Sequence, residues 1–281
     1  MRGNFGDPRT ISPEGLGTDE PGDAGDYSFH NGVDISAEPG TPVFPVVSGI
    51  ARVPDGDAVI VRVPLGARSF RYQHIRPVVH TGARVIAGKT VLGVVKYPAR
   101  HVHLSEIDHG QVTNPATHLR PYTDDTPPVV HELAFRTPNG RQLNPDALRG
   151  PIEVTAQVED TPSIPAPGAW AGFPVAPAVV RWVLVDSRGE SVLARTVVDF
   201  RHHLPSNRQF WRIYAAGTYQ NFPVFDDHYY WHLAGRYLYN LSPKPIDTRT
   251  LANGTYTLRV SASDLCENQG TLAEQIMVEN S

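Results

Sequence analysis

The stretch Phe29-His30-Asn31-Gly32-Val33-Asp34-Ile35 decides the fold more than any other part of the chain. A histidine and an aspartate four residues apart fit one face of a helix. Here, however, Asn31-Gly32 lies between them, and that pair is a turn signal that helices avoid. We therefore expect His30 and Asp34 to lie on a turn that leads into a strand.

A second stretch, His101-Val102-His103-Leu104, completes the pattern. Alternation along a strand puts His101 and His103 on the same face. Zinc binds neutral imidazole nitrogen and carboxylate oxygen, and catalytic zinc sites keep three protein ligands and one position open for water. Two histidines and Asp34 meet that requirement and leave one histidine beside the metal. These residue types therefore favour a catalytic zinc site.

Together with Tyr72-Gln73-His74, these stretches resemble the lysostaphin/LytM-type zinc metallopeptidases. In that family a His-x-x-x-Asp, a Tyr-x-His and a His-x-His follow one another within a small β domain. The segment Gly3-Asn4-Phe5-Gly6-Asp7-Pro8-Arg9 is similar to the one that precedes the first histidine in relatives, and Asn114-Pro115 is similar to the exit of the domain. The resemblance covers roughly residues 3–120.

The resemblance implies one zinc ion bound by His30, Asp34 and His103, with His74 and His101 as unligated catalytic partners. It also implies hydrolysis of peptide cross-links in bacterial peptidoglycan. Histidines beside a metal-bound water can accept its proton or stabilise the developing oxyanion. The expected reaction is therefore zinc-assisted amide hydrolysis.

Other titratable side chains are expected to have ordinary roles. Glu106 is three residues from His103 and hence on the opposite strand face, which excludes it as the catalytic base. His228 and His232, four residues apart, are the right distance for a second metal site on a helix, although ordinary packing is favoured. Surface or core roles are expected for His80, His109, His118 and His131.

One loop departs from the family pattern. Relatives carry a Gly-rich, Ser/Thr-rich loop and a Gly-Pro before the His-x-His, whereas this chain has Lys96-Tyr97-Pro98-Ala99-Arg100. Two alternatives to the cell-wall enzyme therefore stay open. One is a non-cleaving relative that binds cell wall or regulates another hydrolase, although such relatives typically lack a ligand that this chain keeps. The other is a secreted zinc peptidase that acts on proteins.

Composition favours a folded protein of short strands that does not bind nucleic acid. The net charge is −4, without a lysine or arginine cluster, and proline (26) and glycine (24) are abundant. The single cysteine, Cys266, excludes an internal disulfide. The sequence has no apolar run of about 18 residues, so we expect no membrane span. No leader is visible at Met1-Arg2-Gly3-Asn4, but the resemblance implies a removed leader and a periplasmic or secreted location.

Strand patterns divide the chain into two all-β parts. We expect a small antiparallel β metallopeptidase domain over residues 1–122, a linker over 123–128 and an immunoglobulin-like β-sandwich over 129–281. The run Asn253–Asp264 resembles the last strands of bacterial immunoglobulin-like modules. An aromatic-rich insertion at about 200–241 interrupts the sandwich. Its rings are expected either to pack on the metallopeptidase domain or to thicken the core of the sandwich.

Overall fold

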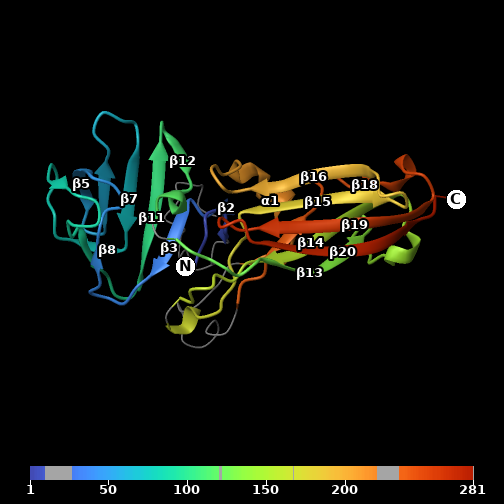
Figure 1. Cartoon of the computed structure of the whole chain (residues 1–281), viewed down its shortest axis with the longest axis horizontal. Coiled ribbons are helices and arrows are strands. Elements are labelled where there is room, and N and C mark those ends of the chain that lie inside the picture. Colours follow the sequence, from blue (N-terminus) through green and yellow to red (C-terminus); the bar gives the residue numbers. More distant parts are fainter. Residues whose placement is uncertain (10–26, 120–121, 167, 220–233, 281) are drawn as a thin grey trace.

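The computed structural model describes residues 1–9, 27–119, 122–166, 168–219 and 234–280. Within these ranges the chain is all-β, because its helices are limited to one four-residue α-turn and short 3-10 turns. The predicted fold class is confirmed. Figure 1 shows two groups of sheets side by side along the long axis, with the C-terminus at the outer end of the second group. No helix within the described ranges is long and apolar enough to cross a lipid bilayer.

The first group of sheets is built from residues that precede Asn114. Its strands are β1 Pro8–Arg9, β2 Ser28–Phe29, β3 Gly32–Ser36, β4 Pro42–Val43, β5 Gly49–Asp55, β6 Ala58–Arg62, β7 Ser69–Gln73, β8 Ile75–Pro77, β9 Arg84–Val85, β10 Gly93–Val95, β11 His101–Asp108 and β12 Gln111–Thr113. The largest sheet has the order β12-β11-β7-β6-β5-β9, and β3 pairs with β11 beside that path. A smaller sheet, β4-β10-β8, and the pair β1-β2 complete the group.

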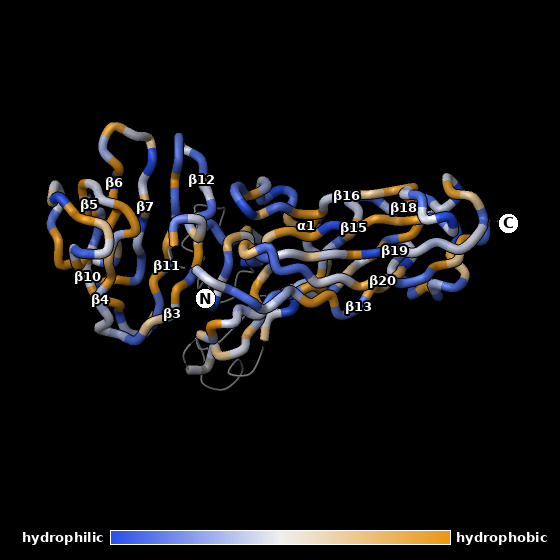
Figure 2. Tube along the Cα trace, viewed as in Figure 1, coloured by the Kyte–Doolittle hydropathy of each residue, from blue (hydrophilic) through white to orange (hydrophobic). Residues whose placement is uncertain are grey.

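Antiparallel pairing of neighbouring strands builds the core of this group. The predicted hairpin at Asp55-Gly56 is present between β5 and β6. In the next pair, Val59 lies opposite Tyr72 and Val61 opposite Phe70, and all four side chains are buried. Figure 2 shows that β6 is mainly hydrophobic and that β7 beside it is mainly hydrophilic. One face of the large sheet therefore packs inward. Side chains that alternate with these core residues along each strand point to the other face.

The second group consists of two antiparallel sheets packed against each other. Its strands are β13 Val129–Arg136, β14 Pro151–Glu159, β15 Val179–Asp186, β16 Ser191–Asp199, β17 Leu238–Asn240, β18 Ile246–Asp247, β19 Gly254–Ser263 and β20 Gln269–Val278. One sheet has the order β13-β14-β17, with β18 also on β14, and the other β16-β15-β19-β20. Trp182 of β15 donates from Nε1 to the carbonyl of Leu241 at 2.5 Å, which joins the two sheets. The immunoglobulin-like type and the predicted boundaries at 122 and 129 stay predictions.

The described part of the aromatic segment packs on the N-terminal residues. Phe29 lies within 6 Å, between ring centroids, of Phe200 (5.8 Å), Phe210 (5.4 Å) and Tyr214 (5.8 Å). The Tyr214 hydroxyl donates to the carbonyl of Gly6 at 2.7 Å. In Figure 1 the short helix α1, Phe210–Ile213, accordingly lies near β2, between the two groups. The expected packing is thus present for these rings, whereas His228, His232 and the rest of 220–233 lie outside the described residues.

Candidate metal centre

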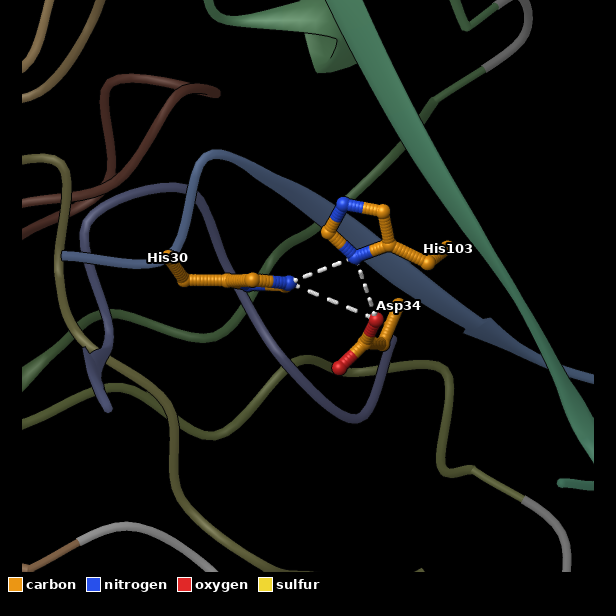
Figure 3. A group of neighbouring side chains, drawn as sticks. All are labelled: His30, Asp34 and His103. Carbon is orange, nitrogen blue, oxygen red and sulfur yellow. Dashed lines mark hydrogen bonds and ion pairs between the residues drawn. The ribbon is translucent and has the colours of Figure 1, made fainter. Parts of the chain in front are cut away.

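Strand pairing brings the predicted ligands together. Asp34 of β3 lies opposite His103 of β11 in the register, so both side chains leave the sheet on the same face. His30 lies in the short link between β2 and β3 and reaches the same point. Figure 3 shows the three side chains pointing toward one another. The prediction that both residues of the His-x-x-x-Asp lie on a turn is wrong for Asp34, which is inside β3.

Gly32 is required by close packing, not by a turn. It is the first residue of β3, and a Cβ there would lie 2.3 Å from the carbonyl oxygen of Leu104. The same Cβ would lie 2.9 Å from Cε1 and Nε2 of the His103 ring. Only glycine therefore lets β3 approach β11 closely enough for the histidine and the aspartate to meet.

The three potential ligand atoms have separations that suit a small metal ion. His30 Nε2 lies 2.9 Å from His103 Nδ1, His103 Nδ1 lies 3.1 Å from Asp34 Oδ1, and His30 Nε2 lies 3.4 Å from Asp34 Oδ1. Tetrahedral zinc with bonds of about 2.0–2.1 Å places its ligand atoms ~3.3 Å apart. Two imidazole nitrogens and one carboxylate oxygen are also the donor types that zinc takes. The residues therefore fit a zinc ion in both spacing and chemistry.

Hydrogen bonds at the far side of each ring fix the tautomers. His30 Nδ1 donates to the carbonyl of Asn4 at 2.9 Å, which leaves the lone pair on Nε2. His103 Nε2 contacts Asn31 Oδ1 at 3.0 Å and Ser105 Oγ at 2.9 Å, which leaves the lone pair on Nδ1. Two lone pairs and a carboxylate oxygen thus face one another. Oriented rings of this kind are typical of metal-ligating histidines.

The carboxylate of Asp34 is oriented by an arginine. Arg9 Nη2 donates to Asp34 Oδ2 at 2.9 Å, so Oδ1 is the oxygen that faces the two histidines. Burial alone raises the pKa of Asp34, but the electrostatic influence of the nearby His30 and His101 holds it well below its usual range. Burial lowers the pKa of His30 to about 4. An ionised carboxylate and a neutral imidazole are the forms that bind metal.

The remaining two histidines of the pattern lie beside this centre. His101 Nδ1 donates to the carbonyl of Ala99 at 2.7 Å, and its Nε2 is 3.6 Å from Asp34 Oδ1. Burial lowers the pKa of His101 to about 3. The His74 ring lies 4.5 Å from the His101 ring, between centroids. His74 follows the end of β7 and has a φ of 63°, so the alternation of side chains along β7 does not extend to it.

The loop Lys96–Arg100, which departs from the family pattern, contacts His101 directly and lies near His74 through Asp57. Ala99 of this loop accepts the hydrogen bond from His101. Lys96 Nζ pairs with Asp57 Oδ1 at 2.6 Å, and Asp57 Oδ2 lies 3.6 Å from His74 Nδ1. The altered loop therefore forms part of the support of the site.

The residues expected to have ordinary roles lie away from the centre. Glu106 pairs through Oε1 with Arg68 Nε and His118 Nε2, each at 3.1 Å, on the face opposite His103. His109 pairs with Asp108 and His131 with Glu159, and His80 contacts the carbonyl of Thr81. This placement agrees with the exclusion of Glu106 as the base.

Four supporting residues were not found from the sequence: Asn4, Arg9, Asn31 and Ser105. Asn4 and Arg9 lie in the segment that resembles relatives, but no pattern links them to His30 or Asp34. Ser105 is two residues from His103 on the same strand, so strand alternation could have placed its side chain on that face. The structure brings together all five predicted site residues, and their chemical roles stay predictions.

Comparisons with known proteins give only distant similarities. No protein-family model matches the chain, and no curated protein matches it. Among solved structures, the chain is similar to a variant of the catalytic domain of the prophage-encoded M23 protein EnpA from Enterococcus faecalis, at 26% identity and a TM-score of 0.28, covering 34% of this chain and 82% of that one. It is also similar to the antimicrobial peptidase lysostaphin from Staphylococcus simulans, at 18% identity and a TM-score of 0.29, covering 48% and 77%. A solution structure of lysostaphin has 14% identity and a TM-score of 0.30, covering 71% and 74%. Because these TM-scores are low, function is inferred below from the residues of the site.

Proposed function

We propose that this chain is a zinc-dependent metalloendopeptidase that hydrolyses peptide cross-links of bacterial peptidoglycan, in the periplasm or outside the cell. The observation that carries this proposal is the convergence of His30 Nε2, Asp34 Oδ1 and His103 Nδ1 within hydrogen-bonding distance of one another. The resemblance of the three sequence elements to lysostaphin/LytM-type enzymes supplies the substrate class.

The residues divide into ligands and proton-handling groups. His30, Asp34 and His103 would hold the zinc ion. Zinc bound there supplies a Lewis acid that polarises the scissile carbonyl and lowers the pKa of a bound water toward about 7. His101 keeps its Nδ1 proton on the Ala99 carbonyl, so its Nε2 is the atom that accepts the proton of the attacking water. His74, whose ring lies beside that of His101, donates a hydrogen bond to the oxyanion as it develops.

Burial assists both steps. His101 is buried and His74 is half-buried, so solvent competes little for their ring nitrogens. Hydrogen bonds are worth more where water is excluded, because the local dielectric constant is lower. The peptide would bind at the side of the site where the half-buried His74 lies.

Metal content and digestion of purified peptidoglycan test the proposal together. The wild-type protein should hold one zinc per chain after dialysis. It should also convert cross-linked peptide stems of peptidoglycan into free stems, which mass spectrometry detects. Asp34→Ala should lose both the zinc and the cleavage, whereas the exposed His80→Ala should keep both. Stoichiometric zinc in Asp34→Ala would overturn the ligand set.

The same experiment separates the alternatives. A zinc-loaded protein that cleaves casein but no peptidoglycan would be the secreted protein-directed peptidase. A zinc-loaded protein that binds sacculi and cleaves neither substrate would be the non-cleaving relative. Either result would contradict the proposed substrate while leaving the metal site in place.

A further inference from the structure

A second cluster of buried carboxylates lies between the two groups of sheets. Asp124 lies in the segment that joins the groups, Asp160 directly follows β14, and Asp264 lies in the turn between β19 and β20. A carboxylate oxygen of each lies within 4.8 Å of one from each of the others. Their exposed fractions are 7%, 1% and 5%. Three acids are thus withdrawn from water at one point.

Two of the carboxylate oxygens in this cluster have no hydrogen-bond partner among the described residues. They are Asp124 Oδ2 and Asp160 Oδ1, and both are buried. The other oxygen of Asp124 accepts from the backbone N–H groups of Thr126 and Ser163, each at 3.0 Å. The hydrogen bonds of the surrounding chain therefore leave these two oxygens unsatisfied, and a buried unsatisfied acceptor is costly.

The charge of the cluster is also not compensated by an ion pair. Among the described residues, no lysine, arginine or histidine side chain forms a salt bridge with any of the three carboxylates. The α-amino group of Met1 attracts Asp124 but makes no ion pair with it. Burial, with Asp124 and Asp264 adding to it, raises the pKa of Asp160 to about 8. The surroundings thus disfavour the negative charges that the sequence places there.

We propose that Asp124, Asp160 and Asp264 bind a calcium ion, which fastens the segment joining the two groups of sheets to the ends of β14 and β19. Calcium takes oxygen ligands at about 2.3–2.6 Å, so two oxygens on one ion lie at most about 5 Å apart, and the cluster meets this limit. No histidine or cysteine belongs to the cluster, so its donors are those of a hard cation and unlike those of the zinc site.

The neighbouring hydrogen bonds show what such an ion would hold. Asp264 accepts through both oxygens from Asn268, at 2.8 Å from the backbone and 2.7 Å from the side chain. The same Asn268 side chain donates to the backbone carbonyl of Asp124 at 2.7 Å. The turn between β19 and β20 is therefore already hydrogen-bonded to the joining segment. An ion would add a third attachment, through Asp160, and neutralise most of the charge.

Calcium binding to the full-length chain in metal-depleted buffer is the direct test. Isothermal titration with CaCl2 should show one ion per chain. At a calcium concentration about 100 times Kd, Tm should rise by about 5 °C or more, because the ion binds only the folded state. The His103→Ala variant should respond equally, which separates this site from the zinc site. No heat and no rise in Tm for the wild type would overturn the proposal, and the two unpartnered oxygens would then be hydrated.

A matched pair of variants locates the ion. Asp160→Asn keeps the shape of the side chain but removes one charge, so calcium affinity should fall at least about tenfold. The exposed Asp146→Asn should bind like the wild type. In calcium-free buffer Asp160→Asn should be at least as stable as the wild type, since it relieves repulsion, and the order should reverse with calcium. Equal calcium affinity in both variants would overturn the assignment to this cluster.

Tb3+ luminescence of the wild type replaces this pair if Asp160→Asn does not fold. Terbium bound at the cluster should luminesce, and added calcium should displace it and remove the signal. Luminescence that calcium does not displace would overturn the proposal.

Discussion

The two buried clusters differ in how much their surroundings complete them. At the histidine cluster, each ligand is oriented from behind by a neighbour: His30 by Asn4, Asp34 by Arg9 and His103 by Asn31 and Ser105. At the aspartate cluster, two buried carboxylate oxygens have no hydrogen-bond partner among the described residues. The first cluster is thus organised by protein groups alone, whereas the proposed calcium ion would complete the second. Preorganisation suits a site that must do chemistry, and incompleteness suits an ion that holds the fold together.

The clusters also differ in what holds their parts. Asp34 and His103 lie on paired strands of one sheet, so their geometry is fixed by backbone hydrogen bonds. Asp124, Asp160 and Asp264 come from three separate connecting segments. Loss of zinc should therefore leave the fold intact, whereas loss of calcium should loosen the attachment of the joining segment. The difference would separate the proposed catalytic ion from the proposed structural one.

The largest expected effect is that each of two variants loses its response to one metal and keeps its response to the other. His103→Ala should lose zinc and turnover, with a loss greater than the roughly 10²–10⁴-fold that removing a general base costs, and should keep its calcium response. Asp160→Asn should do the reverse and keep zinc. Metal analysis and calorimetry on both variants check this. The two sites are not independent if either variant loses both metals while its circular dichroism stays native.

A smaller loss is expected from the histidines that bind no metal. His101→Ala and His74→Ala should retain zinc and fold but lose about 10²–10⁴-fold in turnover. Cleavage assays with parallel zinc analysis measure this, and His109→Ala, at an exposed position, is the matched control. Zinc lost from His101→Ala would mean that the two histidines of β11 have exchanged roles.

A still smaller effect should follow from removing the arginine behind Asp34. Arg9→Gln keeps a donor but removes the charge, so zinc affinity should fall by about 10–100-fold through misplacement of the carboxylate. Competition with a chelator measures the affinity, and the exposed Arg208→Gln is the control. Unchanged zinc affinity would show that Asp34 holds its orientation by strand pairing alone.

The smallest effect is expected from removing one of the hydrogen-bond partners of His103 Nε2. Ser105→Ala should weaken zinc binding by less than about tenfold, because Asn31 still accepts from Nε2. The double variant with Asn31→Ala should weaken it more than the sum of the single changes. Chelator competition decides, with Ser191→Ala on the exposed side of β16 as control. Strict additivity of the two free-energy changes would argue against a shared role.

Two local patterns pointed to the histidine cluster: His30 and Asp34 are four residues apart, and His101 and His103 are two apart on one strand. That the two stretches meet was implied by the resemblance to lysostaphin/LytM-type enzymes, because the pairing of β3 with β11 is long-range. The all-β class followed in the same way from short alternating runs. The direction of His74 could not be predicted, since it depends on a left-handed backbone conformation just beyond β7.

The aspartate cluster could not be predicted, because its members have no common pattern. Asp124, Asp160 and Asp264 are scattered between residues 124 and 264, and each lies in a connecting segment, where aspartate is common. Only the folded arrangement of β14, β19 and the joining segment brings them together. The same holds for Arg9, which reaches Asp34 through tertiary structure alone.

The packing of aromatic rings between the two groups bears on how the proposed enzyme could be recombined with other domains. Phe29, next to the first ligand, is covered by Tyr214 and other rings from the second group. Asn4, which orients His30, is itself held by the carbonyl of Ala176 at 3.2 Å. A chimera that joins residues 1–122 to a foreign cell-wall anchor would uncover Phe29 and leave Asn4 without that contact. The two halves of this chain therefore form one transferable unit, and a working graft must carry the covering rings along with the metal ligands.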